Sequence, residues 1–261
     1  MNLVSRKRPA GEAVGGTRCN ICDSDLWKPD PWKRLVKCAG CGSRPRHRIC
    51  LLVIDHMVLP APGARVLHFA PEAGLSRAIE ARVGSETYEP VDFSPERLEA
   101  ILGRPVGRFD LCKDSFELPS GRYDLILHNH VLEHLPCNYT MVLQALTRAL
   151  APGGVQVFTV PMTAGHYRED LSPNLTPEQR NRAFKQGDHL RIFGKTDFAD
   201  TLGRVVGATR DYAIVDFLPK AALAAANIPS IYWRGVSGSS PFFLRPEGRA
   251  AASLSDRAAE A

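Results

Sequence analysis

Residues 65–96 read RVLHFAPEAGLSRAIEARVGSETYEPVDFSPE, a pattern of alternating strand-like and helix-like segments. A short apolar run at Arg65–Ala70 precedes a helical stretch from Gly74 to Val83, and a second apolar run follows at Thr87–Phe93. Ser94-Pro95-Glu96 then has the composition of a helix start, because serine caps helices and proline fits their first turn. The order strand, helix, strand, helix is typical of parallel sheets.

The alternation continues towards the C-terminus. Tyr123–Asn129 reads as a buried strand, residues 142–150 carry apolar side chains at helical spacing, and Val155–Val160 reads as another strand. Strands separated by helices predict an α/β fold with a Rossmann-like, mostly parallel sheet and helices on both faces. After a polar segment at residues 162–187 and a helix around Lys195–Val206, two further strands are expected to close the sheet as an antiparallel pair. These strands are Asp211–Phe217 and Pro241–Arg245.

The length and composition leave room for one catalytic domain and a small module. The chain has 261 residues, 44% of them apolar, and lacks any apolar run long enough to span a membrane. We expect a cytoplasmic protein with no membrane partner. Residues 1–17 and 246–261 lack apolar periodicity, so we expect disordered tails, the first of them basic.

Four cysteines form two matched pairs, in the pattern Cys19-x2-Cys22-x15-Cys38-x2-Cys41. Each pair can present two thiolates from a tight turn, and together they complete a closed tetrahedral site. This spacing predicts a structural zinc ion in a zinc-knuckle module at residues 18–50; a redox pair and chance spacing are the alternatives. Because the total of seven cysteines is odd and the expected compartment is reducing, we predict no disulfides, and Cys50, Cys112 and Cys137 as unpaired thiols.

Basic residues are concentrated near the N-terminus. The first 50 residues hold 11 Lys and Arg against four Asp and Glu, whereas the whole chain has a net charge of +5. Such asymmetry fits either contact with phosphates or a solvated tail. The cluster Arg44-Pro45-Arg46-His47-Arg48 could contact a phosphate or carboxylate, or pair with acidic residues of the neighbouring domain.

The chain has an ordered series of motifs. They are Val66–Gly74, Val91–Pro95, Asp110, Tyr123–His134 and Leu150–Gly154. In order and spacing this series resembles class I methyltransferases of the type-11 domain kind, over residues 64–210. The resemblance implies a domain at residues 51–245 that uses S-adenosylmethionine (SAM) as its cofactor.

The resemblance also implies cofactor-binding residues. Asp92 ends the second strand, where a carboxylate can accept both ribose hydroxyls of a nucleoside. In the family, the acid matching Asp110 accepts from the adenine amino group; Asp114 is a competing candidate. The first motif of the family has an acid and three glycines, and the matching residues here are His68, Ala70, Glu72 and Gly74. Ala70 is small enough for close approach, and Glu72 either meets the ammonium group of the cofactor or faces solvent in a degenerate site.

The remaining candidates lie near the expected methyl group. In the family, the stretch containing Asn129 and His130 lines the cofactor and substrate cavity. Residues 165–185 have the length and polarity of a substrate lid. If the acceptor is a hydroxyl, His189 or His130 is the candidate base, with Asp188 orienting His189 or merely capping a helix.

Three functions agree with this pattern. The first is methyl transfer to an oxygen or nitrogen of a small molecule or sugar. The second is RNA methylation, since some ribosomal RNA methyltransferases place a cysteine zinc site before a class I domain and the basic N-terminal region suits phosphate contact. The third is a zinc-containing interaction protein with a vestigial cofactor cleft.

Overall fold

The computed structural model describes residues 10–246, which form a central six-stranded sheet and a small three-stranded sheet. The central sheet has the order β12-β8-β7-β4-β5-β6, with every neighbouring pair parallel except β8 and β12. Its strands are β4 (Val66–Phe69), β5 (Tyr88–Asp92), β6 (Gly107–Arg108), β7 (Tyr123–Asn129), β8 (Leu150–Thr159) and β12 (Phe242–Leu244). The predicted Rossmann-like α/β fold is therefore confirmed.

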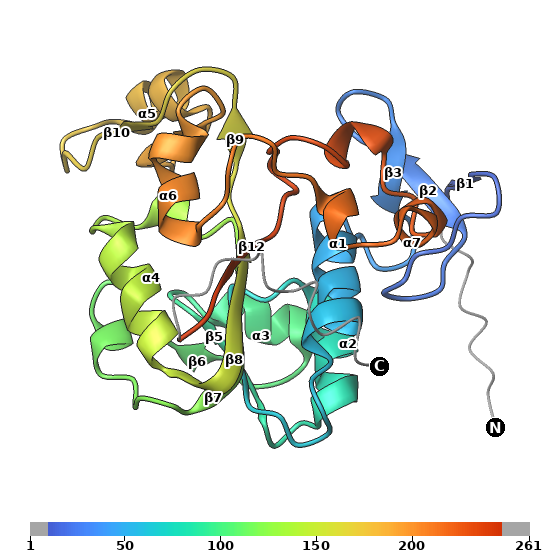
Figure 1. Cartoon of the computed structure of the whole chain (residues 1–261), viewed down its shortest axis with the longest axis horizontal. Coiled ribbons are helices and arrows are strands. Elements are labelled where there is room, and N and C mark those ends of the chain that lie inside the picture. The colour runs from blue at the N-terminus through green and yellow to red at the C-terminus, as the bar shows by residue number, and fades with distance from the viewer. Residues whose placement is uncertain (1–9, 247–261) are drawn as a thin grey trace.

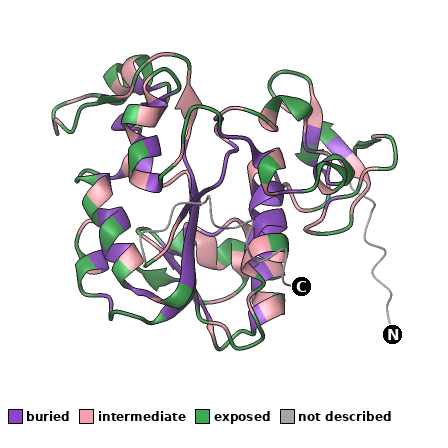
Figure 2. Ribbon diagram, viewed as in Figure 1, coloured by how far each residue is buried: buried purple, intermediate pink, exposed green. Residues whose placement is uncertain are grey.

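Helices pack on both faces of this sheet (Figure 1). Those preceding and following β4 and β5 are α1 (Pro45–Val53), α2 (Ala73–Val83) and α3 (Glu96–Leu102). The helices α4 (Tyr139–Arg148) and α6 (Leu202–Val206) contact β8 and β12 respectively. Figure 2 shows that buried residues concentrate on β8 and α1, both of which contribute side chains to the hydrophobic core.

The cysteine module consists of β1 (Glu12–Ala13), β2 (Leu26–Pro29) and β3 (Leu35–Cys38), paired antiparallel in that order. Arg48 on α1 lies fully buried at its base and stacks over the ring of Trp27 at 4.7 Å. The Arg48 guanidinium donates to the Val36 and Ser43 carbonyls in the module and to the Ala226 and Asn227 carbonyls after α7 (Lys220–Ala225). One arginine thus joins the module to the C-terminal part of the chain.

Between β8 and the C-terminal strand, the chain forms a second small sheet with the order β10-β11-β9. Its strands are β9 (Met162–Thr163), β10 (Arg168–Glu169) and β11 (Arg191–Gly194). The helix α5 (Pro177–Phe184) starts at Thr176, whose hydroxyl accepts from the Gln179 backbone. The segment expected as a lid, residues 165–185, is therefore partly regular.

Three sequence predictions of secondary structure are wrong. Asp211–Phe217 is not a strand: Ile214–Asp216 form a short 3₁₀ helix, and only Ala213 makes a bridge, to Arg234. The antiparallel partner of β12 is instead β8, which was already an apolar strand with a free edge. The helix expected over Lys195–Val206 is split into a 3₁₀ helix at Phe198–Asp200 and α6. Within the expected N-terminal tail, β1 pairs with β2, because its backbone extends the edge of the module.

A disulfide joins Cys112 to Cys137, so the prediction from the sequence that both are unpaired thiols is wrong. It ties the loop after β6 to the turn that precedes α4, across 25 residues of sequence. Cys50 is buried and free, as expected. Spacing could not reveal the pair, because Cys112 and Cys137 meet only once β6 and β7 take their places in the sheet.

No helix among residues 10–246 is long and apolar enough to cross a membrane. Residues 1–9 and 247–261 lie outside the described residues, and with them most of the two predicted tails.

Candidate active site

The four matched cysteines come together at one point of the module. Their sulfur atoms all lie within 4.8 Å of one another, with 3.7 Å between Cys19 and Cys41 and 3.5 Å between Cys22 and Cys38. Sulfur atoms bound to one zinc ion at about 2.3 Å stand about 3.8 Å apart. The four thiols therefore have the spacing of a tetrahedral zinc site, and no disulfide links any of them.

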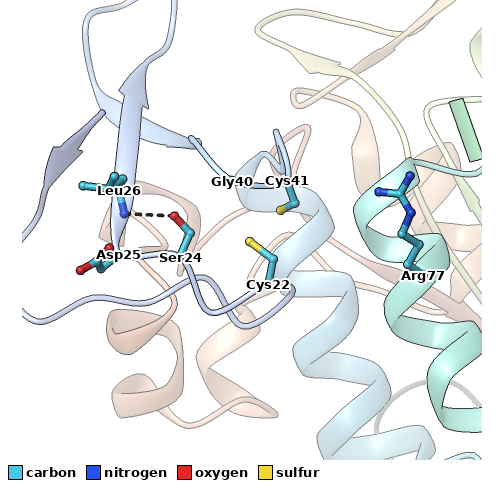
Figure 3. Close-up of a pocket in the computed structure, with 7 residues that line it drawn as sticks. All are labelled: Cys22, Ser24, Asp25, Leu26, Gly40, Cys41 and Arg77. Carbon is cyan, nitrogen blue, oxygen red and sulfur yellow. Dashed lines mark hydrogen bonds between the residues drawn. The ribbon is translucent and has the colours of Figure 1, made fainter. Parts of the chain in front are cut away.

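The cysteine site packs directly against the start of α2. A Cβ added to Gly74 would lie 3.1 Å from the Cβ of Cys41 and 3.2 Å from Ile21. Beside this contact is a cavity of about 430 Å³ lined by both cysteine turns and by Arg77 of α2, which Figure 3 shows facing Cys41 across the opening. Gly74, the one glycine retained in the first motif, thus provides close packing for the module.

The loop between β4 and α2 carries the other residues of that motif. Ala70 has a φ of 46°, a left-handed conformation that glycine adopts more readily. The Glu72 side chain is only 19% exposed, so the alternative of a solvent-facing Glu72 is wrong. Its carboxylate lies 3.1 Å from His47 Nε2 and 3.6 Å from His68 Nε2. Burial acts to raise the pKa of Glu72, but these imidazoles hold it well below its usual range.

His47 was not predicted as part of the site. It belongs to the basic run 44–48, for which pairing with an acid of the neighbouring domain was one alternative, and the His47–Glu72 pair confirms that alternative for this residue. His68 does not line an open cleft: it is fully buried in β4, where its Nδ1 shares a 2.7 Å hydrogen bond with the Tyr88 hydroxyl. Its role is therefore to contact the Glu72 carboxylate from inside the sheet.

The acids that follow the next two strands lie at the same edge of the sheet. Asp92 ends β5, is half-buried, and accepts from the Ser94 backbone at 2.7 Å; burial raises its pKa. Phe93, beside it, is an exposed aromatic ring. After β6, Asp110 accepts from the Cys112 backbone at 3.0 Å and lies 3.3 Å from Lys113 Nζ, while Asp114 accepts from the Asp110 backbone at 2.7 Å. Asp114 therefore supports the turn that presents Asp110.

Asn129 at the end of β7 connects to Glu72. Its amide nitrogen donates to Glu72 Oε2 at 3.4 Å, and its oxygen accepts from Thr159 at 3.0 Å and from the Cys50 thiol at 3.2 Å. The next residue, His130, has a φ of 55° and donates from Nε2 to the Gly238 carbonyl at 2.8 Å. Burial lowers the pKa of His130 to about 3, so its ring is neutral at physiological pH.

Beyond β7, a short 3₁₀ helix at Leu132–His134 faces the turn before β11. The backbone of Leu190 donates to the Glu133 carbonyl at 2.8 Å, and the His134 and His189 rings meet edge to face at 4.8 Å between centroids. Asp188 is not a helix cap and does not orient His189 as expected: its carboxylate lies 3.4 Å from His134 Nδ1. Burial lowers the pKa of His189 and raises that of Glu133 to about 8.

Taken together, the predicted residues fit SAM at the carboxyl ends of β4 to β7. An ionised carboxylate stands at Glu72, a small residue at position 70, and further carboxylates follow β5 and β6. Such a row of acids at the switch point of a parallel sheet suits the ammonium, ribose and adenine donors of the cofactor.

Comparison with known proteins identifies the family of the domain. Residues 44–205, more than half of the chain, match a family described as a methyltransferase domain. No curated protein matches the chain at a significant level. Among solved structures, the [4+2]-cyclase SpnF is 16% identical over 69% of this chain and 61% of its own, with a TM-score of 0.44. This chain therefore spans about three fifths of the cyclase.

Two other structures are similar over more of their own length. One is a chain of the complex between the Haloferax volcanii Trm112 methyltransferase activator and the putative methyltransferase, 12% identical over 76% of this chain and 88% of that one, with a TM-score of 0.46. The other is an S-adenosylmethionine dependent methyltransferase from Mesorhizobium loti, 16% identical over 70% and 90%, with a TM-score of 0.43. On the strength of the family match, the chain belongs to the methyltransferase domain family and carries a SAM-dependent methyltransferase domain.

Proposed function

We propose that this methyltransferase acts on an oxygen or nitrogen of a small molecule or sugar. The proposal rests on the observation that other parts of the chain cover the end of β7. Two separate chain segments reach it: Leu190 donates to the Glu133 backbone, and the Gly238 carbonyl accepts from His130. Glu133 and His189 are buried where these segments meet. A covered site of this kind suits a compact acceptor better than a polymer.

Each candidate residue then has a defined part. When bound, SAM supplies a methyl group already activated by its sulfonium. Asp92 would accept from the ribose hydroxyls, Asp110 from the adenine amino group, and Glu72 from the ammonium group. His130 or His189 would take the proton of a hydroxyl acceptor. Most of the remaining catalysis is alignment of the acceptor and exclusion of water.

The burial of basic side chains in the run 44–48 also favours a small acceptor over a nucleic acid. Arg48 is fully buried on backbone carbonyls, His47 is paired with Glu72, and Arg46 is largely covered. The basic run 44–48 therefore serves internal packing more than phosphate contact. One feature favours RNA instead: Trp32, 73% exposed, lies on the β2–β3 hairpin with exposed lysines at 28, 33 and 37. Aromatic and basic side chains together suit single-stranded nucleic acid.

Label transfer separates the two acceptors. The protein is incubated with methyl-labelled SAM and either a low-molecular-weight cell extract or total RNA, with Asp92→Ala as a control for cofactor dependence. We expect label in small molecules, lost in the variant. Label in RNA that disappears as salt is raised would instead support the RNA acceptor and refute the proposal.

A further inference from the structure

A polar cluster beyond the end of β7 has more ligand-type atoms than methyl transfer requires. It consists of Glu133, His134 and His189, and one ligand atom from each lies within 4.8 Å of the other two. Glu133 and His134 belong to the 3₁₀ helix at Leu132–His134, while His189 belongs to the turn before β11. Two imidazoles and one carboxylate thus converge from separate parts of the chain.

The carboxylate of Glu133 is buried without a hydrogen-bond partner. The residue is fully buried, and neither of its carboxylate oxygens has a hydrogen-bond partner among residues 10–246. The nearest imidazole nitrogens are His130 Nδ1 at 3.6 Å and His134 Nε2 at 3.9 Å from Oε1, both too distant for a hydrogen bond. Burying an unpaired carboxylate is costly, so such a group calls for a cation.

The imidazoles are oriented for ligation. His134 Nδ1 faces the Asp188 carboxylate at 3.4 Å and the Asp188 carbonyl at 3.3 Å, which places the ring proton on Nδ1 and leaves the Nε2 lone pair towards Glu133. A carboxylate behind a histidine is the usual support of a metal ligand. His189 Nδ1 is also buried without a partner in the described part of the chain.

Arg191 holds the two ligand segments together. Its guanidinium is fully buried and donates to the Leu132 carbonyl and, at 2.9 Å, to the Cys137 carbonyl, while Glu169 accepts from its Nε at 2.6 Å. Both carbonyls flank the Glu133-His134 pair. The backbone that carries the ligands is therefore fixed before any ion binds.

From this geometry we propose that Glu133, His134 and His189 bind one divalent first-row transition-metal ion. Two imidazoles and a carboxylate suit such ions better than Mg²⁺, which prefers six oxygen ligands. Ligands at about 2.1 Å from one ion stand roughly 3 to 3.5 Å apart, so the three atoms, which lie within 4.8 Å of one another, must close by up to about 1–2 Å. Three protein ligands leave positions open for an oxygen of the acceptor, and with His189 bound to the ion the proton of a hydroxyl acceptor would pass to His130; these roles alone rest on the proposed function.

Manganese distinguishes this site from the thiolate site, which favours softer ions. Protein with zinc already in the cysteine site is titrated with Mn²⁺, and free Mn²⁺ is followed by electron paramagnetic resonance. We expect saturable binding of one ion per chain. His189→Ala and Glu133→Gln should each weaken the affinity at least about tenfold, since each removes one of three ligands. His166→Ala, which replaces an exposed histidine between β9 and β10, should leave the Mn²⁺ affinity unchanged.

Thermal unfolding separates a metal ligand from a structural residue. Without Mn²⁺, Glu133→Gln should be about as stable as the parent protein, because burial raises the pKa of Glu133 to about 8 and glutamine replaces a largely neutral carboxyl group with a neutral amide of the same shape. With Mn²⁺, only the parent should gain stability. The proposal would be overturned if the parent protein showed no saturable Mn²⁺ binding, or if both ligand variants bound Mn²⁺ with the affinity of the parent. S-adenosylhomocysteine (SAH) binding in the same samples tests the methyltransferase function independently of the metal.

Discussion

The Nε2 atom of His47 lies 3.1 Å from the carboxylate of Glu72, and this contact joins the helix that follows the cysteine module to the loop after β4. His47 is on α1, which begins directly after the cysteine module, and Glu72 precedes α2 at the carboxyl edge of the sheet. The module is therefore connected to the residue that we place at the ammonium group of SAM.

Replacing Glu72 with glutamine keeps the shape of the side chain and removes its charge. A charge-assisted contact with the ammonium group would be lost, so the Glu72→Gln variant should bind SAH about tenfold more weakly, or about 1.4 kcal/mol. Isothermal titration calorimetry measures this, with exposed Glu86→Gln as the control. Equal affinities for Glu72→Gln and the parent would remove Glu72 from the cofactor site.

Gly74→Ala tests the contact between module and catalytic domain. The new methyl group would lie 3.1 Å from the Cβ of Cys41, which a zinc ion on the four cysteines would hold in place, so we expect a loss of about 1–3 kcal/mol in unfolding free energy. Zinc release to a chelator should also become faster. At Gly238 the nearest atom to an added Cβ is 3.6 Å away, so Gly238→Ala should release zinc at the parental rate. If both variants behave alike, the packing contact is not significant.

The Cys112–Cys137 disulfide closes a loop of 25 residues. Breaking it therefore raises the conformational entropy of the unfolded chain. Changing both cysteines to serine should lower the unfolding free energy by about 3 kcal/mol in denaturant titrations. A phosphine reductant should shift the parent by a similar amount and leave the double variant unaffected. A parent protein that is insensitive to reductant and as stable as the double variant would show that the bond does not form.

Stability should fall in acid because of His128. This residue is fully buried, stacks on Phe158 at 4.8 Å between ring centroids, and has its pKa lowered by burial to about 3 from an ordinary value of 6.5. Between these values the unfolded chain binds a proton that the native protein does not. His128 alone should therefore lower the unfolding free energy by about 1.4 kcal/mol for each pH unit from about pH 6 towards pH 3, and His130, whose pKa burial also lowers to about 3, should add a similar slope.

The His128→Phe variant isolates the contribution of His128 to the pH dependence of the unfolding free energy. Denaturant titrations at several pH values should give a shallower acid slope for the variant, even if its stability at neutral pH differs. An unchanged slope would mean that His128 titrates normally in the folded protein.

The sheet could be predicted from the sequence because β4, β5, β7 and β8 are apolar runs separated by helices of ordinary length. The cysteine site was equally accessible, since its ligands are set by local spacing. Asp211–Phe217 misled the prediction because its apolar residues pack into the core from a 3₁₀ turn. A buried strand and a buried 3₁₀ turn can have the same pattern of apolar residues in the sequence.

The tertiary parts of the site could not be predicted. His47 meets Glu72 only because α1 lies beside α2, and Asp188 turns to His134 only because β11 places its turn beside the 3₁₀ helix. Both contacts join residues more than 20 positions apart in sequence. The resemblance of residues 66–74 to the first motif predicted the position of the loop. It did not predict that Gly74 packs against Cys41.

SAH binding by the parent protein and by Asp92→Ala tests the central claim most directly. Asp92 ends β5 with a half-buried carboxylate that we assign to the ribose hydroxyls. Calorimetry should show one saturable site in the parent and an affinity at least about tenfold weaker in the variant, because two hydroxyl donors lose their acceptor. The absence of saturable binding by the parent, or an unchanged affinity in Asp92→Ala, would contradict a cofactor site at this edge of the sheet.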